Sequence, residues 1–281
     1  MREVQLGLYE KSMPDNLDLY QKLLDTKAAG HDYLELSIDE SDDKLIRLEY
    51  PDAELNALRR ATEKTGTPIR SICLSGHRKY PLGDPDPDIR ARSMQIMRKA
   101  IAFAHKLGVP IIQLAGYDVY YKPSTRETEA LFCDNLRLSV EFAAASGVTL
   151  AFETMETPFL NTTEKAMVWV NKMQSPWLQV YPDLGNITNA FDGCRDLVIK
   201  DIETGRGHIP AMHLKETAPG VFRGLSYGQG HVDFAGGAGK AYSMGVRMFV
   251  GEFWYNGQDD WRNLLFENRL FLRDVLDKIS L

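Results

Sequence analysis

Cysteine is scarce in this 281-residue chain, and the three that occur, Cys73, Cys133 and Cys194, lie far apart without CxxC spacing. A sparse, odd-numbered set of this kind excludes a disulfide framework and a zinc knuckle, both of which need paired or clustered cysteines. We therefore expect reduced thiols in a cytoplasmic protein. A chain of this length buries most of its apolar surface on folding and needs no such staples.

Positive charge is also in short supply, because 33 lysine and arginine residues face 39 acidic ones and the formal net charge is −6. An acidic balance provides no global basic field, so we expect no nucleic-acid partner. No apolar run approaches the roughly 18 residues of a membrane span, and the segment after Met1 lacks the charged-then-apolar pattern of a signal peptide. We therefore expect neither a membrane span nor a leader.

Glycine, by contrast, recurs in one repeated setting, where an apolar-periodic stretch ends and a new apolar run begins within three residues. The glycines in this setting are Gly30, Gly66, Gly108, Gly147 and Gly245. Glycine is favoured just after a helix because it adopts the left-handed conformation without a Cβ clash. The first four lie 36, 42 and 39 residues apart, so they indicate a repeated helix–strand unit.

Short apolar runs typical of parallel strands covered on both faces complete the repeat. Helical periodicity fills the gaps between them, most clearly over 89–107, 126–146 and 261–280. Eight strand–helix units predict an α/β fold, a (β/α)8 TIM barrel that forms a single catalytic domain over 1–281. A doubly wound open sheet is the alternative. The predicted strands lie near 4–9, 33–37, 69–74, 110–115, 148–153, 178–182, 209–214 and 247–252.

Polar side chains end four consecutive predicted strands, each directly after apolar residues: Glu153, Asp183, His213 and Glu252. The chemistry of a TIM barrel lies at these C-terminal strand ends. Three carboxylates gathered there would repel one another and become protonated unless a cation lay among them. Each residue alone is equally compatible with a salt bridge to a barrel lysine or arginine. Together they predict one divalent metal ion, Mn²⁺, Mg²⁺, Co²⁺ or Zn²⁺, on oxygen-rich ligands with one imidazole.

Four further polar residues near these strand ends are weaker candidates for contacts with a substrate. Glu156 is placed either to bind a substrate hydroxyl or to cap the next helix. His77 and Arg78 follow the third predicted strand, where they would hold a phosphate or line the entrance. Lys215 follows the seventh strand and is close enough in sequence to reach the same oxygens or to neutralise the carboxylates.

Three other features have simple expected roles. The turn at 228–230 offers backbone N–H groups to a phosphate or is an ordinary loop. His31 and His105 lie at predicted helix ends, where we expect solvated side chains. Phe253 and Trp254 are expected in the core or in a pocket wall.

Six segments, spread in order over nearly the whole chain, carry a family resemblance. They are LGLYEK at 6–11, ELSIDE at 35–40, CLSGHR at 73–78, QLAGYDVYY at 113–121, YPDLGN at 181–186 and HLKET at 213–217. With them the chain resembles the sugar-phosphate isomerase/epimerase superfamily of TIM barrels. Within that superfamily it is most similar to the L-ribulose-5-phosphate (L-xylulose-5-phosphate) 3-epimerases of ascorbate and pentose catabolism. One departure is Glu216, where the family pattern has aspartate.

The resemblance implies that Glu153, Asp183, His213 and Glu252 are the metal ligands and that Glu153 and Glu252 also form the catalytic acid/base pair. It implies a small-molecule ketose phosphate as substrate, epimerised at C3 through an enediolate. Inversion needs one group to remove the C3 proton and another to return a proton on the opposite face. Two carboxylates from separated strands suit that task.

Several alternatives remain open at this stage. A 3-epimerase of unphosphorylated ketoses and an aldose–ketose isomerase would both use a bound metal ion and an enediol intermediate. An endonuclease IV-like nuclease would need further histidines, one of them after the fourth strand, where the chain has 113–116 QLAG. A barrel used only as a scaffold would not need to keep all four strand-end residues. A homodimer, formed through 261–281 or through the outer helices, is a further open alternative.

Overall fold

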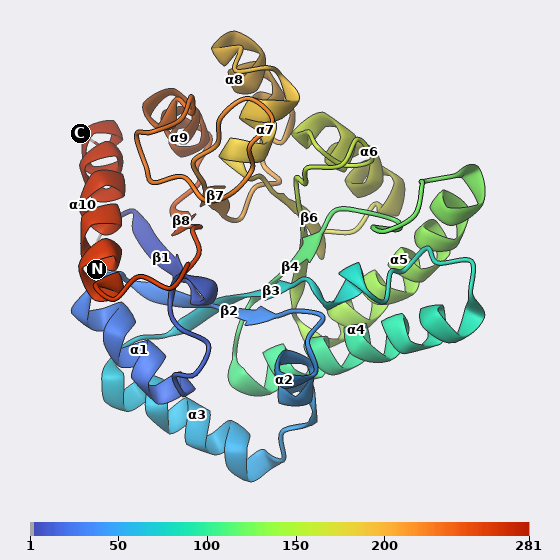
Figure 1. Cartoon of the computed structure of the whole chain (residues 1–281). Helices are drawn as coiled ribbons and strands as arrows, with labels where there is room; N and C mark the ends of the chain where they lie inside the picture. The colour runs from blue at the N-terminus through green and yellow to red at the C-terminus, as the bar shows by residue number, and fades with distance from the viewer. Residues whose placement is uncertain (1–2, 281) are drawn as a thin grey trace.

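The computed structural model describes residues 3–280, and its eight strands form a parallel barrel ringed by helices (Figure 1). Hydrogen-bonded neighbours follow the order β6-β5-β4-β3-β2-β1-β8-β7. The strands are β1 Gln5–Tyr9, β2 Tyr33–Ile38, β3 Ile69–Leu74, β4 Ile111–Ala115, β5 Thr149–Glu153, β6 Leu178–Tyr181, β7 Met212–Leu214 and β8 Met248–Gly251. All eight strands predicted from the sequence are present.

Between β6 and β7 the barrel closes through individual backbone hydrogen bonds and not through a continuous ladder. The Val180 amide donates to the His208 carbonyl at 2.9 Å, and the His213 amide donates to the Pro182 carbonyl at 2.9 Å. Pro210 has no N–H to donate, so β7 begins later than predicted and is only three residues long. This order of eight parallel strands, with its two end strands linked by these bonds, confirms the TIM barrel and rules out the open doubly wound sheet.

Helices cover the outside of the barrel, and those over 89–107, 126–146 and 261–280 are confirmed within two residues at each end. Gly66, Gly108 and Gly147 follow helices with φ of 65°, 73° and 66°, as their predicted role requires. The helices are α1 Leu19–Ala28, α2 Asp42–Leu45, α3 Asp52–Thr65, α4 Pro87–Leu107, α5 Arg126–Ser146, α6 Thr163–Met173, α7 Leu184–Ala190, α8 Arg195–Thr204, α9 Phe234–Ser243 and α10 Trp261–Ile279, with 3-10 helices η1 Glu10–Ser12, η2 Ile46–Glu49 and η3 Gly76–Arg78.

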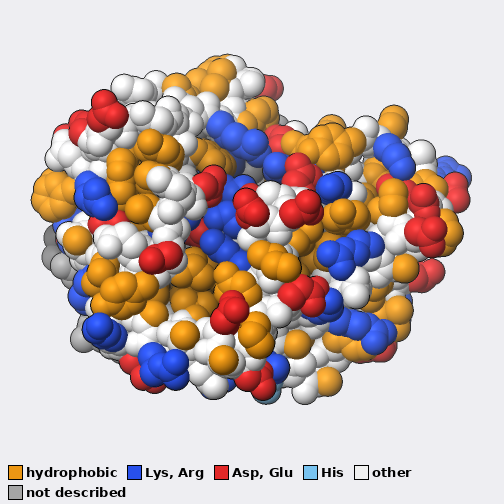
Figure 2. Space-filling model, turned by 60° about the horizontal axis from the view of Figure 1, so that its bottom comes forward, with side chains coloured by type: hydrophobic (Ala, Val, Ile, Leu, Met, Phe, Trp, Pro, Cys, Tyr) orange, Lys and Arg blue, Asp and Glu red, His pale blue; other side chains and the backbone are white. Residues whose placement is uncertain are grey.

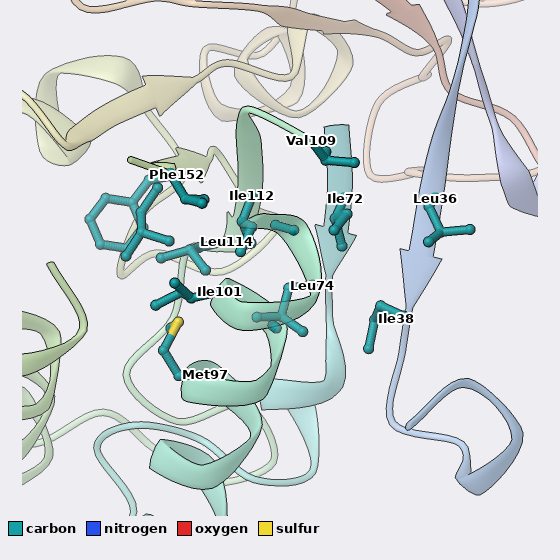
Figure 3. Packing of buried hydrophobic residues seen from close by; sticks show 14 of the residues in the cluster. Leu36, Ile38, Ile72, Leu74, Met97, Ile101, Val109, Ile112, Leu114 and Phe152 are labelled. Atoms are coloured by element: carbon teal, nitrogen blue, oxygen red, sulfur yellow. The ribbon is translucent and has the colours of Figure 1, made fainter. Parts of the chain in front are cut away.

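The main core lies between the strands and the helices that cover them. Met97 and Ile101 of α4 lie beside Ile112 and Leu114 of β4, and all four are buried (Figure 3). Long helices such as α4 and α5 bury an apolar stripe against the strands in this way. None of the helices in residues 3–280 is long and apolar enough to cross a membrane.

Charged side chains of both signs are interspersed on the face of the molecule seen in Figure 2. A hollow near the middle of that face contains lysine or arginine side chains, with acidic side chains beside it (Figure 2). Basic side chains therefore gather locally although the chain as a whole is acidic.

His31 departs from its expected environment, because its side chain is buried and only 2% exposed. The prediction of a solvated His31 is therefore wrong, whereas His105 is exposed as expected. His31 lies between α1 and β2, where α10 covers it with Arg269 and Arg273. Burial, and then the positive charge of these two arginines, lowers the pKa of His31 to about 3.

We expect the protein to lose stability on acidification, because folded His31 stays neutral where unfolded His31 takes up a proton. Its folded pKa of about 3 lies below the ordinary value of 6.5, so its contribution is full at neutral pH and declines as the pH falls from 6.5 toward 3. Between pH 7 and pH 5 the free energy of unfolding should fall by about 2 kcal/mol through this group. Urea unfolding at both pH values measures the loss. His31→Leu should remove most of it, and an unchanged pH dependence would contradict the assignment.

Candidate metal centre and substrate pocket

The four polar residues that end consecutive strands meet at one mouth of the barrel. Glu153 ends β5, Asp183 follows β6, His213 lies in β7 and Glu252 follows β8. Each residue has one possible ligand atom, and these four atoms all lie within 4.8 Å of one another. All four residues are buried. Parallel strands of a barrel end at the same rim, which is why residues so distant in sequence become neighbours.

The imidazole of His213 faces the three carboxylates through Nδ1. This atom lies 3.1 Å from Glu153 Oε1, 3.5 Å from Glu252 Oε2 and 3.9 Å from Asp183 Oδ2. The ammonium of Lys215 approaches the same group, with Nζ at 2.8 Å from Asp183 Oδ2 and 3.3 Å from Glu252 Oε2. Three buried carboxylates therefore converge on one imidazole nitrogen and one ammonium.

The protonation behaviour of this cluster shows the need for positive charge. Burial, and then the charge of Glu252, raises the pKa of Glu153, and burial likewise raises the pKa of Asp183. The pKa of Glu252 lies well below its usual range because Lys215 and His213 outweigh the effect of burial. Without a further cation the carboxylates are thus driven to share protons.

Two oxygens of the cluster fit a metal ion particularly well. Asp183 Oδ2 and Glu252 Oε2 are buried and have no hydrogen-bond partner within residues 3–280. The Lys215 ammonium and His213 Nδ1 lie within 4 Å of both oxygens. Carboxylate oxygens with one imidazole are ligands that divalent first-row metals accept. The buried cluster could therefore hold a metal ion.

A cavity of about 60 Å³ opens beside the cluster, lined by Glu153 and Glu252. Its wall includes Tyr9, Arg78, Glu156, Lys215, Arg223 and Trp254. Three of the four weaker sequence candidates, Arg78, Glu156 and Lys215, are thus brought to the cavity, and Trp254 forms part of its wall as expected.

His77 is the exception among these candidates. It is buried, its Nε2 lies 3.3 Å from the Ser93 carbonyl oxygen in α4, and it does not line the cavity. The single-turn η3 directs Arg78 toward the mouth and the preceding His77 toward the helix layer. We therefore leave His77 out of the proposed substrate contacts.

Glu156 points into the pocket and does not cap the following helix. The Tyr120 hydroxyl donates to Glu156 Oε1 at 2.9 Å, and Arg223 Nη2 lies 3.6 Å from the same oxygen. Helix α6 is capped instead by Thr162, whose side chain accepts from the Lys165 amide. Of the two alternatives drawn from the sequence, the pocket position is the one observed.

Comparison with known proteins identifies the family. Residues 23–274 match the family described as xylose isomerase-like TIM barrel. The chain belongs to this family. It is 44% identical, over 233 residues, to an L-ribulose-5-phosphate 3-epimerase UlaE of Escherichia fergusonii, which covers 83% of this chain and 81% of the relative. A protein of the same name from Escherichia coli strain CFT073 is equally similar. The resemblance drawn from the six sequence segments is thereby confirmed.

Solved structures agree on the xylose isomerase-like barrel. An L-ribulose 3-epimerase superposes with a TM-score of 0.80 at 20% identity, over 99% of this chain and 96% of its own. A D-psicose 3-epimerase crystallised in the presence of D-fructose superposes with a TM-score of 0.81 at 16% identity, over 97% and 99%. At these identities the likeness supports the fold alone.

Several side chains of this family member support the cluster although the sequence did not single them out. Gln113 of β4 donates from Nε2 to Glu153 Oε2, and Glu35 of β2 contacts His213. Arg223 comes from the long loop after β7. The sequence signal that could have pointed to Gln113 and Glu35 is a polar residue within an apolar strand. Such a residue is equally compatible with an ordinary buried hydrogen bond.

Glu216, the departure from the family pattern, organises the loop that follows β7. It is buried and accepts from the Gly228 amide at 2.7 Å and from the Val232 amide at 3.3 Å. The Gly228 amide is therefore engaged, which argues against a phosphate site at the 228–230 turn. The longer acid reaches across the loop and ties its two ends together.

Proposed function

We propose that this chain is a metal-dependent 3-epimerase that interconverts L-ribulose 5-phosphate and L-xylulose 5-phosphate. The observation that carries the proposal is the buried group of Glu153, Asp183, His213 and Glu252, whose ligand atoms lie within 4.8 Å of one another. The relatives that are 44% identical to the chain bear the name of this activity. We infer one divalent ion, Mn²⁺, Mg²⁺, Co²⁺ or Zn²⁺, on these four ligands. A cytoplasmic location, a homodimer and a single domain over 1–281 stay predictions.

The chemistry follows from what inversion at C3 requires. A divalent ion in this site would polarise the C2 carbonyl and stabilise the negative charge that develops when C3 loses its proton. Glu153 and Glu252 both line the cavity, from strands separated by β6 and β7. One carboxylate removes the C3 proton, and the other group delivers a proton to the opposite face. Their exchange of roles allows reaction in both directions.

Two arginines at the cavity support a phosphorylated substrate over a free ketose. The Arg78 guanidinium lies 4.7 Å from the centre of the Tyr120 ring, and that of Arg223 lies 5.2 Å from the Trp254 ring. Stacking holds each planar guanidinium while leaving its edge available. Arg78 Nε is buried and has no hydrogen-bond partner within residues 3–280. A phosphate would satisfy it through charge-assisted bonds.

Proton NMR in D₂O tests the proposed reaction with L-ribulose 5-phosphate, the protein and Mn²⁺, the metal being removed before spectra are recorded. We expect deuterium at C3 and formation of L-xylulose 5-phosphate. Deuterium at C1 with an aldose product would support an aldose–ketose isomerase instead. Faster turnover of free L-ribulose would support an epimerase of unphosphorylated ketoses, and no exchange with either sugar would contradict the proposal.

Arg78→Gln is expected to lower kcat/KM for L-ribulose 5-phosphate by about 10–100-fold, because a hydrogen bond to a charged group is worth about 1.5–3 kcal/mol. For free L-ribulose the same variant should change kcat/KM little, since the phosphate contact is missing in both proteins. Arg98→Gln is the matched control, because Arg98 stacks on Phe142 at 4.1 Å but is exposed on α4, outside the cavity. Equal losses for both sugars would sink the phosphate role.

A further inference from the structure

Glu35 is a buried carboxylate on β2 that faces the barrel interior behind His213. Its Oε1 lies 2.5 Å from His213 Nε2. Its Oε2 accepts from the Ser71 hydroxyl of β3 at 2.6 Å and from the Tyr181 hydroxyl of β6 at 2.9 Å. Glu35, Ser71, Tyr181 and His213 are all 0% exposed. Each oxygen of Glu35 is thus occupied by a partner on another strand.

These bonds determine which nitrogen of His213 carries the proton. An ionised carboxylate only accepts hydrogen bonds, so the imidazole must donate to Glu35 from Nε2. In the neutral ring Nδ1 then carries the lone pair, and Nδ1 is the atom that faces Glu153, Asp183 and Glu252. The ring plane is held as well, because Tyr181 packs edge-on against it with centroids 5.0 Å apart.

The alternative role for Glu35 is simply that of an interior hydrogen-bond acceptor. A carboxylate is an expensive acceptor for that purpose, because burial of its charge must be offset by partners. The Ser71 and Tyr181 hydroxyls do not need a carboxylate, whereas the Nε2–H of His213 needs an acceptor at this place, and an ionised carboxylate is a stronger acceptor than an amide. Orienting a histidine ligand through a carboxylate on its other nitrogen is a general device of metal sites.

We propose that Glu35 is a positioning residue that orients His213 for metal binding, with Ser71 and Tyr181 holding Glu35 in place. Glu35 itself lines no part of the substrate cavity. This inference rests on the metal site of the proposed function. Loss of Glu35 should therefore weaken metal binding while the metal-free fold remains.

The test is a titration of metal-free protein with Mn²⁺, with free Mn²⁺ measured by electron paramagnetic resonance. Glu35→Gln should raise the dissociation constant by about 10–100-fold, the usual effect of removing such a partner. Ser71→Ala and Tyr181→Phe should raise it less, because each removes one of the two hydroxyl donors to Glu35 Oε2. These two variants keep the proposal testable if Glu35→Gln does not fold.

Asp201→Asn is the matched control for the loss of a buried carboxylate. Asp201 lies on the outer helix α8 and accepts from the Thr163 amide at 2.7 Å and the Glu164 amide at 3.0 Å. We expect it to lower the melting temperature of the metal-free protein but to leave the Mn²⁺ dissociation constant unchanged. A purely structural Glu35 would behave in the same way.

The outcomes separate this inference from the proposed function. Wild-type affinity in Glu35→Gln, with Asp183→Asn clearly weakened, would overturn the role of Glu35 and leave the metal site intact. Failure of the wild-type protein to bind Mn²⁺, or full affinity in Asp183→Asn, would overturn the metal site and the role of Glu35 together. Weakened Mn²⁺ binding in Glu35→Gln, with unchanged binding in Asp201→Asn, supports both the metal site and the role of Glu35.

Discussion

Replacement of Glu153 by glutamine is expected to slow C3 epimerisation of L-ribulose 5-phosphate by about 10²–10⁴-fold, the usual contribution of a general acid or base. Glutamine keeps the size of the side chain and one oxygen, but it can neither remove nor deliver a proton. Glu153 lines the cavity, and Gln113 donates to its Oε2. The carboxylate is therefore held in one position beside the substrate cavity.

Deuterium uptake at C3, followed by NMR under saturating Mn²⁺, measures the effect of Glu153→Gln. The Mn²⁺ dissociation constant of the variant must be measured beside it, so that loss of a base is separated from loss of a ligand. Glu49→Gln, at an exposed ion pair with Lys99, is the control and should retain the wild-type rate. A metal-loaded Glu153→Gln protein that keeps more than about a tenth of the rate would contradict acid/base catalysis by this residue.

Replacement of Glu10 by glutamine is expected to lower the free energy of unfolding by about 3–5 kcal/mol, the cost of leaving buried charges unpaired. Glu10 is fully buried, with its oxygens 2.9 Å from Lys22 Nζ, 2.7 Å from Lys44 Nζ and 2.6 Å from Arg47 Nη1. It also accepts from the Ser37 amide at 2.8 Å. A neutral side chain would remove the buried carboxylate that contacts all three cations. Asp15, whose Oδ1 lies 3.2 Å from Lys44 Nζ, is exposed and pairs with Lys44.

Urea unfolding measures this loss at neutral pH. Glu49→Gln is again the matched control, because an exposed pair contributes only about 0–1 kcal/mol. Although burial opposes its charge, Arg47, Lys22 and Lys44 hold the pKa of Glu10 well below the ordinary 4.5. The stabilisation is therefore present above pH 4.5 and declines below it. Equal effects of the two substitutions would refute a special role for Glu10.

The Glu10 cluster also changes how the family resemblance is understood. Glu10 belongs to the 6–11 segment that helped to identify the family, yet it holds β1, β2 and α1 together and touches no ligand of the metal site. Glu35, in the 35–40 segment, contacts His213 directly. The shared segments thus indicated the family correctly. They did not show which of their residues stabilise the fold and which contact the metal ligands.

The fold was predictable because its signals are local. Apolar periodicity distinguishes helix from strand within a few turns, and a glycine such as Gly108 marks a helix end through its own backbone preference. Once the repeat implied a barrel, the strand ends were known to share one rim, and Glu153, Asp183, His213 and Glu252 could be grouped from the sequence alone. The late start of β7 was not foreseen, although Pro210, which has no N–H to donate, lies within the predicted strand.

The sequence by itself therefore determined the alternating units, the barrel and the four residues at its mouth. Only the tertiary structure decided which side chains support them. Glu35 and His213 are 178 positions apart, and Gln113 and Glu153 are 40 apart, so no local pattern relates them. His77 and Arg78 are adjacent in sequence, yet one turns to α4 and the other to the cavity. Side-chain direction and burial depend on packing between distant elements, and these contacts exist only once the barrel has closed.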